Sequence, residues 1–333
     1  MELKDIEHAM NDYILNIGAY NNKIFANLPF YLNISLQLEK TLEKYFKDYK
    51  YEVRYEEISK ISLFDKIKLI KQFYDEVGIS FDIDKYINDG TIDFRYYDYF
   101  YDNEDTESYK LFRFGVGNNC YYGEKKIVNV SENGLITDIP IIIHELSHLR
   151  NQPDIKRNQV SDLLTETLAI TEVFICADYL SKKGYKFEMH KLIKDQLYAL
   201  YKGIVDMKSI YRMVLLFDEL GSISKEDYKY YYDNDDEYEF DLEKLKNIKD
   251  KRSFITESWY ILATALAPFL YCQYKKDKSF MKNIIKLHDM INNSDELECF
   301  KEMGLTYLDS AEREQLLECI DNIMNDMDNI KTL

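Results

Sequence analysis

The sequence predicts a mainly α-helical protein with one small β-sheet. Gly and Pro are rare, with 11 Gly and 4 Pro in 333 residues, and helices run long where such turn-forming residues are scarce. Apolar residues recur at helical spacing from residue 1 to about residue 78, and again from residue 137 to the C-terminus. Between these regions the chain is dense in aromatic residues and contains Gly, a pattern that favours strands and turns.

The N-terminal helical region shows its period most clearly in one stretch. Polar residues there separate a series of apolar ones, Leu32, Leu36, Leu38, Leu42 and Phe46. This spacing gathers the apolar side chains on one face of a helix.

The central region contains the predicted strands. A Tyr- and Asp-rich stretch begins at residue 93 and continues into LFRFGVGNNCYYG, and residues 126–130 (KIVNV) have the composition of a further strand. The following SENGL is typical of a turn. We therefore expect a small sheet over about residues 111–130, beside the helix that begins near residue 137.

Two loops interrupt the C-terminal helices, near residues 151–158 and in the acidic, Tyr-rich stretch 227–240. The acidic stretch is expected to be a solvated loop or helix end. No internal repeat of a solenoid period is visible. We predict a helical N-terminal region, residues 1–110, followed by a second domain, residues 111–333.

Composition excludes several classes of protein. A net charge of −17, from 43 Lys+Arg and 60 Asp+Glu, argues against nucleic-acid binding, which needs clustered basic residues. The longest apolar runs fall short of the roughly 20 residues that span a bilayer, and no signal-peptide pattern is present. Five Cys, widely spaced and without a C-x-x-C pair, indicate a reducing compartment. We expect a cytoplasmic protein without membrane or nucleic-acid partners.

The motif that indicates a metal-binding and catalytic site is H-E-x-x-H, from His144 through Glu145 to His148. On a helix, residues i and i+4 share a face, so both imidazoles can bind one Zn²⁺ while Glu145 faces the water that the metal activates and serves as general base. With only five His in the chain, a chance occurrence is rare. The alternative is a pair of surface His residues without a metal.

A third ligand is expected from the next helical stretch, which offers Asp162, Glu166 and Glu172. Glu166 and Glu172 are six residues apart, about 240° around a helix, so one straight helix cannot aim both at one ion. Glu166 shares its face with Ile170 and Val173, which suits a helix packed against the H-E-x-x-H helix. We favour Glu166, with Glu172 and Asp162 as alternatives.

Residues 110–333 resemble the oligoendopeptidase F / thimet oligopeptidase family of zinc metallopeptidases. Asn129, Gly134 and Asp138 precede His144 much as in the family, with two extra residues before the Gly. Gln152-Pro153 follows the motif, as is common in the family. The resemblance continues at Glu166 and Tyr179 and in the C-terminal third, at Tyr260, Ala263 and Ala267.

The chain also departs from the family pattern. Ser147 stands where members usually have Gly, and a second family Glu falls on Val173, with Glu172 one position early. Ser258 replaces a family Tyr, and no His lies between His190 and His288. The N-terminal region is also shorter than the helical half that roofs the family's substrate channel.

The resemblance implies a zincin-like helical peptidase domain with the small β-sheet beside its active-site helix. It implies a gluzincin, a zinc metalloendopeptidase of oligopeptides, in which His144, His148 and Glu166 hold one Zn²⁺ per chain and Glu145 is the general base. Tyr260 would stabilise the oxyanion, although a Tyr in an apolar helix is otherwise usually a core residue. Asp138 and Glu172 would position the ligand side chains without binding the metal themselves.

Two alternatives stay open from the same residues. One is a relative that binds peptides and metal without efficient turnover, and the other is a processing protease dedicated to one protein partner. The remaining His residues, His8, His190 and His288, are expected to be ordinary surface or partly buried residues. The sequence leaves oligomeric state, endo or exo cleavage, and the physiological metal undecided.

Overall fold

The computed structural model describes ten stretches of the chain: residues 28–49, 58–95, 117–122, 125–131, 133–150, 159–226, 228, 258–291, 296–305 and 310–328. Within them the protein is mainly α-helical with one small sheet, which confirms the predicted fold class. The acidic stretch 227–240 lies almost wholly outside the described residues, as does the loop at 151–158. None of the described helices combines the length and apolar character that crossing a membrane requires.

The chain divides into two compact units, each built from two separate parts of the sequence. Unit 1 comprises residues 1–48 and 197–265, and unit 2 comprises residues 49–196 and 266–333. The predicted boundary at residue 110 lies outside the described residues and stays a prediction.

Unit 1 contains α3 (Leu28–Phe46), the part of α9 (Lys186–Leu220) from Leu197 onward and the first turns of α13 (Ser258–Lys276). The predicted helical period is visible in α3, where Leu38, Leu42 and Phe46 are buried. The Phe46 ring packs against two Tyr rings of α9, Tyr198 at 5.6 Å and Tyr201 at 6.0 Å between centroids.

Unit 2 contains the sheet and the remaining helices. Its elements in chain order are α4 (Leu63–Val77), α5 (Ile83–Asn88), β1 (Ile92–Arg95), β2 (Gly117–Tyr122), β3 (Lys125–Ser131), α7 (Asp138–Arg150), α8 (Gln159–Leu180), η4 (Ser181–Tyr185), the start of α9, most of α13, η5 (Lys278–Phe280), α14 (Met281–Met290), α15 (Glu296–Glu302) and α16 (Ser310–Asp328).

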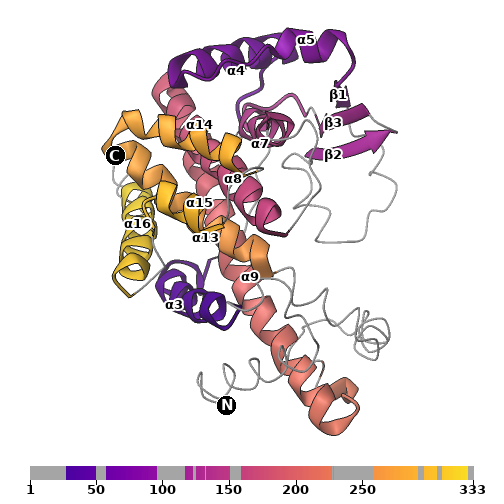
Figure 1. Ribbon diagram of the computed structural model, residues 1–333, viewed down its shortest axis with the longest axis vertical. Coiled ribbons are helices and arrows are strands. Elements are labelled where there is room, and N and C mark those ends of the chain that lie inside the picture. Colours follow the sequence, from indigo (N-terminus) through magenta and orange to yellow (C-terminus); the bar gives the residue numbers. More distant parts are fainter. Residues whose placement is uncertain are drawn as a thin grey trace. The chain divides into compact units, whose positions relative to one another are not determined.

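The sheet has the order β1-β3-β2, with β1 parallel and β2 antiparallel to β3. Val128 on the central strand is fully buried and aligns with Ile92 on one side and Asn119 on the other. The sheet begins earlier than the predicted residue 111, because β1 pairs with a strand about 35 residues later, as parallel pairing through a long connection allows. As predicted, the sheet lies beside the helix of the H-E-x-x-H motif: α7 contacts β2 and β3 (Figure 1).

The centre of unit 2 is the pair α7 and α8, which pack along each other. α7 buries Ile139, Ile142, Ile143 and Leu146 completely. α8 is apolar on nearly all sides and, apart from Glu166 and Asp178, is buried from Leu163 to Leu180, as expected of a helix surrounded by other elements. The two helices that carry the predicted ligands are therefore both deeply embedded in this unit.

Candidate metal centre

Helix α7 places His144 and His148 one turn apart on the same face. Their rings meet edge to face with centroids 4.7 Å apart, and their Nε2 atoms are 3.1 Å apart. Glu166 approaches from α8, with Oε2 3.3 Å from His144 Nε2 and Oε1 3.2 Å from His148 Nε2. The structure thus brings together the three residues that the sequence singled out as ligands.

The donor atoms of this group fit a tetrahedral zinc ion. Ligands bound at 2.0–2.1 Å in tetrahedral geometry lie about 3.3 Å from each other, close to the 3.1, 3.2 and 3.3 Å seen here. Within the described ranges, no other three His, Cys, Asp or Glu side chains form such a group. Two imidazoles and one carboxylate are also the donor set typical of a catalytic zinc site.

Hydrogen bonding at Glu166 supports the same interpretation. Its Oε2 atom is buried and, among the described residues, accepts no hydrogen bond of good geometry, although His144 Nε2 lies 3.3 Å away. Three lone-pair donors that face one another at such distances repel each other unless a proton or a cation lies between them. The residues present therefore fit a bound metal ion.

The charges at the site favour a cation. Burial lowers the pKa of His144, but the carboxylates of Glu166, Glu145 and Glu172 outweigh this effect and raise it above its usual value. Burial likewise opposes ionisation of Glu166, yet the neighbouring imidazoles of His144 and His148 hold the pKa of its carboxyl well below the usual range. A positive charge at this point is thus stabilised from several sides.

Glu145 follows His144 on α7 and is buried, with 6% of its surface exposed. Its charge acts on the His144 imidazole, so it lies near the ligand group. A carboxylate beside a metal-binding His pair can accept a proton from water, the property required of a general base.

Asp138 supports the start of α7. It forms an ion pair with Lys66 of α4 at 2.5 Å, in which both side chains are almost completely buried. It also accepts backbone hydrogen bonds from Asn133 at 2.9 Å and Leu135 at 3.0 Å. Because these are its partners, Asp138 holds the helix that carries the imidazoles, rather than the imidazoles themselves.

Glu172 supports the end of α7. It is fully buried on α8 and binds Arg150, the last residue of α7, and His288 of α14, whose Nε2 lies 2.8 Å from Glu172 Oε1. Arg150 Nη2 is also 3.3 Å from His288 Nε2, and the Arg150 guanidinium lies 5.5 Å from the ring centre of Tyr74. Burial raises the pKa of Glu172, but Arg150 and His288 outweigh it and lower the pKa.

Several predicted residues are not placed at the site. The side chains of Asp162, Tyr260 and Asn129 lie outside the described part of the chain, as does Gln152-Pro153. Tyr179 is buried, with its hydroxyl 3.5 Å from Gln72 Oε1 and its ring packed on Phe73. Burial raises the pKa of Tyr179 to about 12.

Sequence reasoning missed three supporting residues: Lys66, Arg150 and His288. The sequence predicts an ordinary surface or partly buried His288, but it is buried in the ion-pair network, since it extends the apolar stripe of Met281, Ile284 and Leu287 on α14. Lys66 likewise lies on the apolar face of α4, where a lysine requires a buried partner. In both helices, a polar residue at a position of the apolar period was the sequence signal for a buried side chain that needs a partner.

No family model matches the sequence, and no curated protein matches it. Two solved structures do. A protein from Bacillus anthracis with the provisional name oligoendopeptidase F matches with a TM-score of 0.57 and 13% identity, over 97% of this chain and 57% of that one. A second structure of a protein with the same provisional name, solved at 3.1 Å, matches with a TM-score of 0.55 and 12% identity, over 96% of this chain and 58% of the other.

These similarities show that the chain has the fold of proteins called oligoendopeptidase F, as the resemblance predicted. The chain spans somewhat more than half the length of the two solved structures that it matches.

Proposed function

We propose that this protein is a zinc-dependent metallopeptidase that hydrolyses peptide bonds of oligopeptides. The observation that carries the proposal is the convergence of His144, His148 and Glu166 within ligand distance of one another, on the helix of an H-E-x-x-H motif and its neighbour. The fold shared with proteins named oligoendopeptidase F supports the proposal independently.

In this proposal, two imidazole Nε2 atoms and the Glu166 carboxylate hold one Zn²⁺ per chain. The ion, when bound, supplies a Lewis acid that polarises the scissile carbonyl and makes water more acidic. The buried side chains fix the donors in place before substrate arrives, because α7 and α8 are held by packing and by ion pairs at both ends of α7.

Glu145 would carry the protons of the reaction. Its carboxylate accepts a proton from the attacking water and transfers it to the amine nitrogen that leaves as the peptide bond breaks. Tyr260, by the family resemblance, would donate a hydrogen bond to the negatively charged carbonyl oxygen. Peptide is therefore the substrate class.

The test is a comparison of wild type with Glu145→Gln, in metal content and in cleavage of a quenched-fluorescent peptide library. We expect both to hold about one zinc per chain, and the variant to cleave about 10²- to 10⁴-fold more slowly, because it lacks the proton acceptor. Glu314→Gln, at an exposed position of α16, is the matched control and should behave as wild type. Full activity in Glu145→Gln contradicts the proposed mechanism.

A second candidate is a peptide-binding relative with weak turnover. It is favoured by Glu172, which pairs with Arg150 and His288 and contacts neither ligand imidazole. Zinc and peptide binding without cleavage of any library member would support it. Cleavage confined to one folded protein would instead support a dedicated processing protease.

We also propose a cytoplasmic location. The four Cys whose side chains are described, Cys176, Cys272, Cys299 and Cys319, are all free thiols. Localisation of the tagged full-length chain in its own cells tests this directly.

A further inference from the structure

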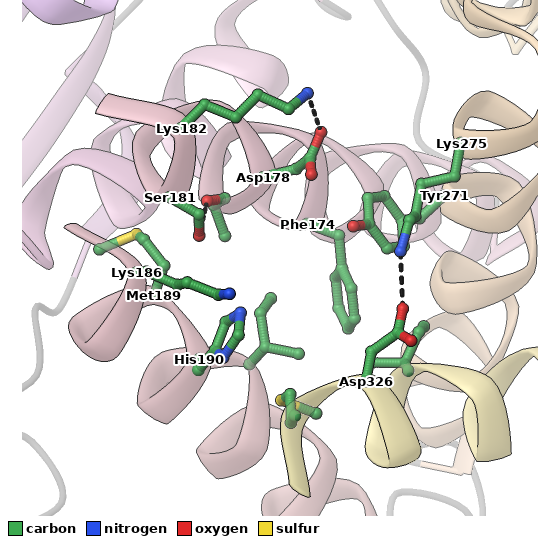
Figure 2. A pocket seen from close by; sticks show the side chains of 14 residues that line it. Phe174, Asp178, Ser181, Lys182, Lys186, Met189, His190, Tyr271, Lys275 and Asp326 are labelled. Carbon is green, nitrogen blue, oxygen red and sulfur yellow. Dashed lines mark hydrogen bonds and ion pairs between the residues drawn. The ribbon is translucent and has the colours of Figure 1, made fainter. Parts of the chain in front are cut away.

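A cavity lies in unit 2, and none of the candidate metal ligands lines it (Figure 2). It lies where the turn between α8 and α9 meets α13 and α16, and it has a volume of about 500 Å³. Small-molecule sites commonly measure about 300 to 1,000 Å³. Its first lining residue on α8, Phe174, is eight residues beyond Glu166, about 12 Å along the helix.

The cavity has an apolar wall. Phe174 on α8, Met189 and Ile193 on α9, and Ile323 and Met327 on α16 line it, and all five are buried. Such a wall favours the apolar part of a ligand, because each methylene transferred from water gains roughly 0.8 kcal/mol.

The acidic residues of the lining already have partners. Asp178 pairs with Lys182 at 2.7 Å, and Asp326 pairs with Lys275 at 2.9 Å, as the dashed lines in Figure 2 show. Asp178 also pairs with Lys278, which lies outside the lining, at 3.5 Å. Both carboxylates are thus neutralised by lysines of the same lining.

Two basic side chains of α9 also line the cavity, and neither takes part in the ion pairs of Asp178 and Asp326. Lys186 and His190, one helical turn apart, point into the cavity next to each other (Figure 2). Among the residues that the structure describes, none forms a hydrogen bond or ion pair with either. Burial, together with the positive charges of Lys186 and Lys275, lowers the pKa of His190, which leaves a neutral imidazole beside a lysine.

The lining therefore contains three lysines and two aspartates, an excess of one positive charge in a chain whose net charge is −17. One carboxylate balances that excess. A phosphate, with close to two charges, would be repelled by the carboxylates of Asp178 and Asp326 in the same lining, whereas a neutral ligand would gain no attraction from the Lys186 ammonium.

We propose that this cavity binds a small monocarboxylate with an apolar body. The ammonium of Lys186 and the imidazole of His190 hold the carboxylate, and the wall of Phe174, Ile193 and Met189 takes the apolar part. This site is separate from the proposed peptidase function and does not depend on a bound metal.

Isothermal titration of the full chain with two probes tests the proposal. Octanoate represents a fatty acid, and N-acetyl-leucine represents the carboxyl end of an apolar peptide. At least one should bind with a Kd below about 1 mM, and the stronger binder identifies the source of the carboxylate. Octan-1-ol, without the charge, and acetate, without the apolar body, should each bind at least tenfold more weakly. No binding heat from either probe at millimolar concentrations overturns the proposal.

Variants assign the binding to this cavity. Lys186→Met keeps most of the side-chain length but removes the charge, and it should weaken binding at least tenfold without changing the melting temperature, because Lys186 is exposed. His190→Phe should also weaken binding. Lys202→Met, an exposed lysine of the same helix, is the control and should bind as wild type. Unchanged binding by Lys186→Met, or octan-1-ol binding as tightly as octanoate, contradicts the proposal.

The peptidase variant separates the two proposals. Glu145→Gln and chelator-treated wild type should bind the probe as well as untreated protein does. Binding that disappears with the metal would place the probe at the metal centre and overturn the separate site.

Discussion

Arg150 and Glu172 form a buried ion pair between the two helices that carry the candidate ligands. Arg150 lies two residues after His148 on α7, and Glu172 lies six residues after Glu166 on α8. The pair therefore fixes the position of α7 along α8 close to the point where His148 and Glu166 meet. At the other end of α7, Lys66 and Asp138 hold the first turn.

Removing Glu172 should loosen the candidate metal centre. Glu172→Gln leaves the Arg150 guanidinium buried without a full counter-charge, which we expect to cost about 3 to 5 kcal/mol of unfolding free energy. It should also weaken zinc binding about 10- to 100-fold, because the ion pair that fixes α7 along α8 beside the ligands is lost. Urea unfolding and competition with a zinc chelator measure the two effects.

The control for this prediction is a double-mutant cycle. Arg150→Met combined with Glu172→Gln removes both charges, so the double variant should be more stable than the sum of the two single losses predicts. Additive losses would show that the two side chains do not act as a pair. Glu314→Gln, an exposed acid, should leave both stability and zinc affinity unchanged.

The stability of the protein should fall as the solution is acidified, in part through His288. Burial lowers the pKa of His288 in the folded state, so below the ordinary pKa of His, near 6.5, the unfolded chain binds more protons than the folded one. The folded state therefore loses stability as pH falls through that value. The lowered pKa of Glu172 acts in the same direction at a more acidic pH, because its contribution is present above the ordinary pKa of Glu and is lost below it.

Unfolding free energies of wild type and His288→Gln, measured from pH 8 to pH 5, test the contribution of His288. The variant should show the smaller loss between pH 7 and pH 5. Parallel curves for the two proteins would mean that His288 does not titrate differently on unfolding.

The two residues of the Lys66 and Asp138 pair should differ in their effect on stability. Asp138→Asn removes the carboxylate that pairs with the buried Lys66 ammonium, and we expect a loss of about 3 to 5 kcal/mol. Lys66→Met should cost less, because Asp138 still accepts hydrogen bonds from the backbone of Asn133 and Leu135. Urea unfolding gives both values.

An exposed ion pair of the same helix provides the comparison. Lys71 of α4 pairs with Asp84 of α5 at 2.5 Å, with 41% and 58% of the two side chains exposed. Lys71→Met should therefore change stability by less than about 1 kcal/mol. If the losses from Lys66→Met and Lys71→Met are equal, burial is not what makes the first pair important.

Glu166→Gln and Glu145→Gln should separate metal binding from proton transfer. Glu166→Gln replaces a carboxylate ligand with a weak amide ligand and should lose most bound zinc, whereas Glu145→Gln should keep it. Zinc at 100 times its Kd stabilises the folded chain by about 2.7 kcal/mol, so chelation should lower the melting temperature of wild type and Glu145→Gln but hardly that of Glu166→Gln. Equal zinc content in both variants would exclude Glu166 as a ligand.

The helical fold and the ligand group could be predicted from the sequence because both rest on local periodicity. The spacing of His144 and His148 places them on one helix face, and the six-residue interval between Glu166 and Glu172 allows only one of them to reach that face. The structure has the three predicted ligand residues together. The role of Tyr260 stays a prediction, because its side chain lies outside the described residues.

Only the tertiary structure decided which distant residues support those helices. β1 pairs with β3, Lys66 with Asp138, and Glu172 with both Arg150 and His288, over separations of 22 to 116 residues. Periodicity shows that a side chain such as Lys66 or His288 faces the interior, but not which group it meets there. Pairing across such separations depends on how whole helices pack, and the amino-acid sequence contains no local signal of that packing.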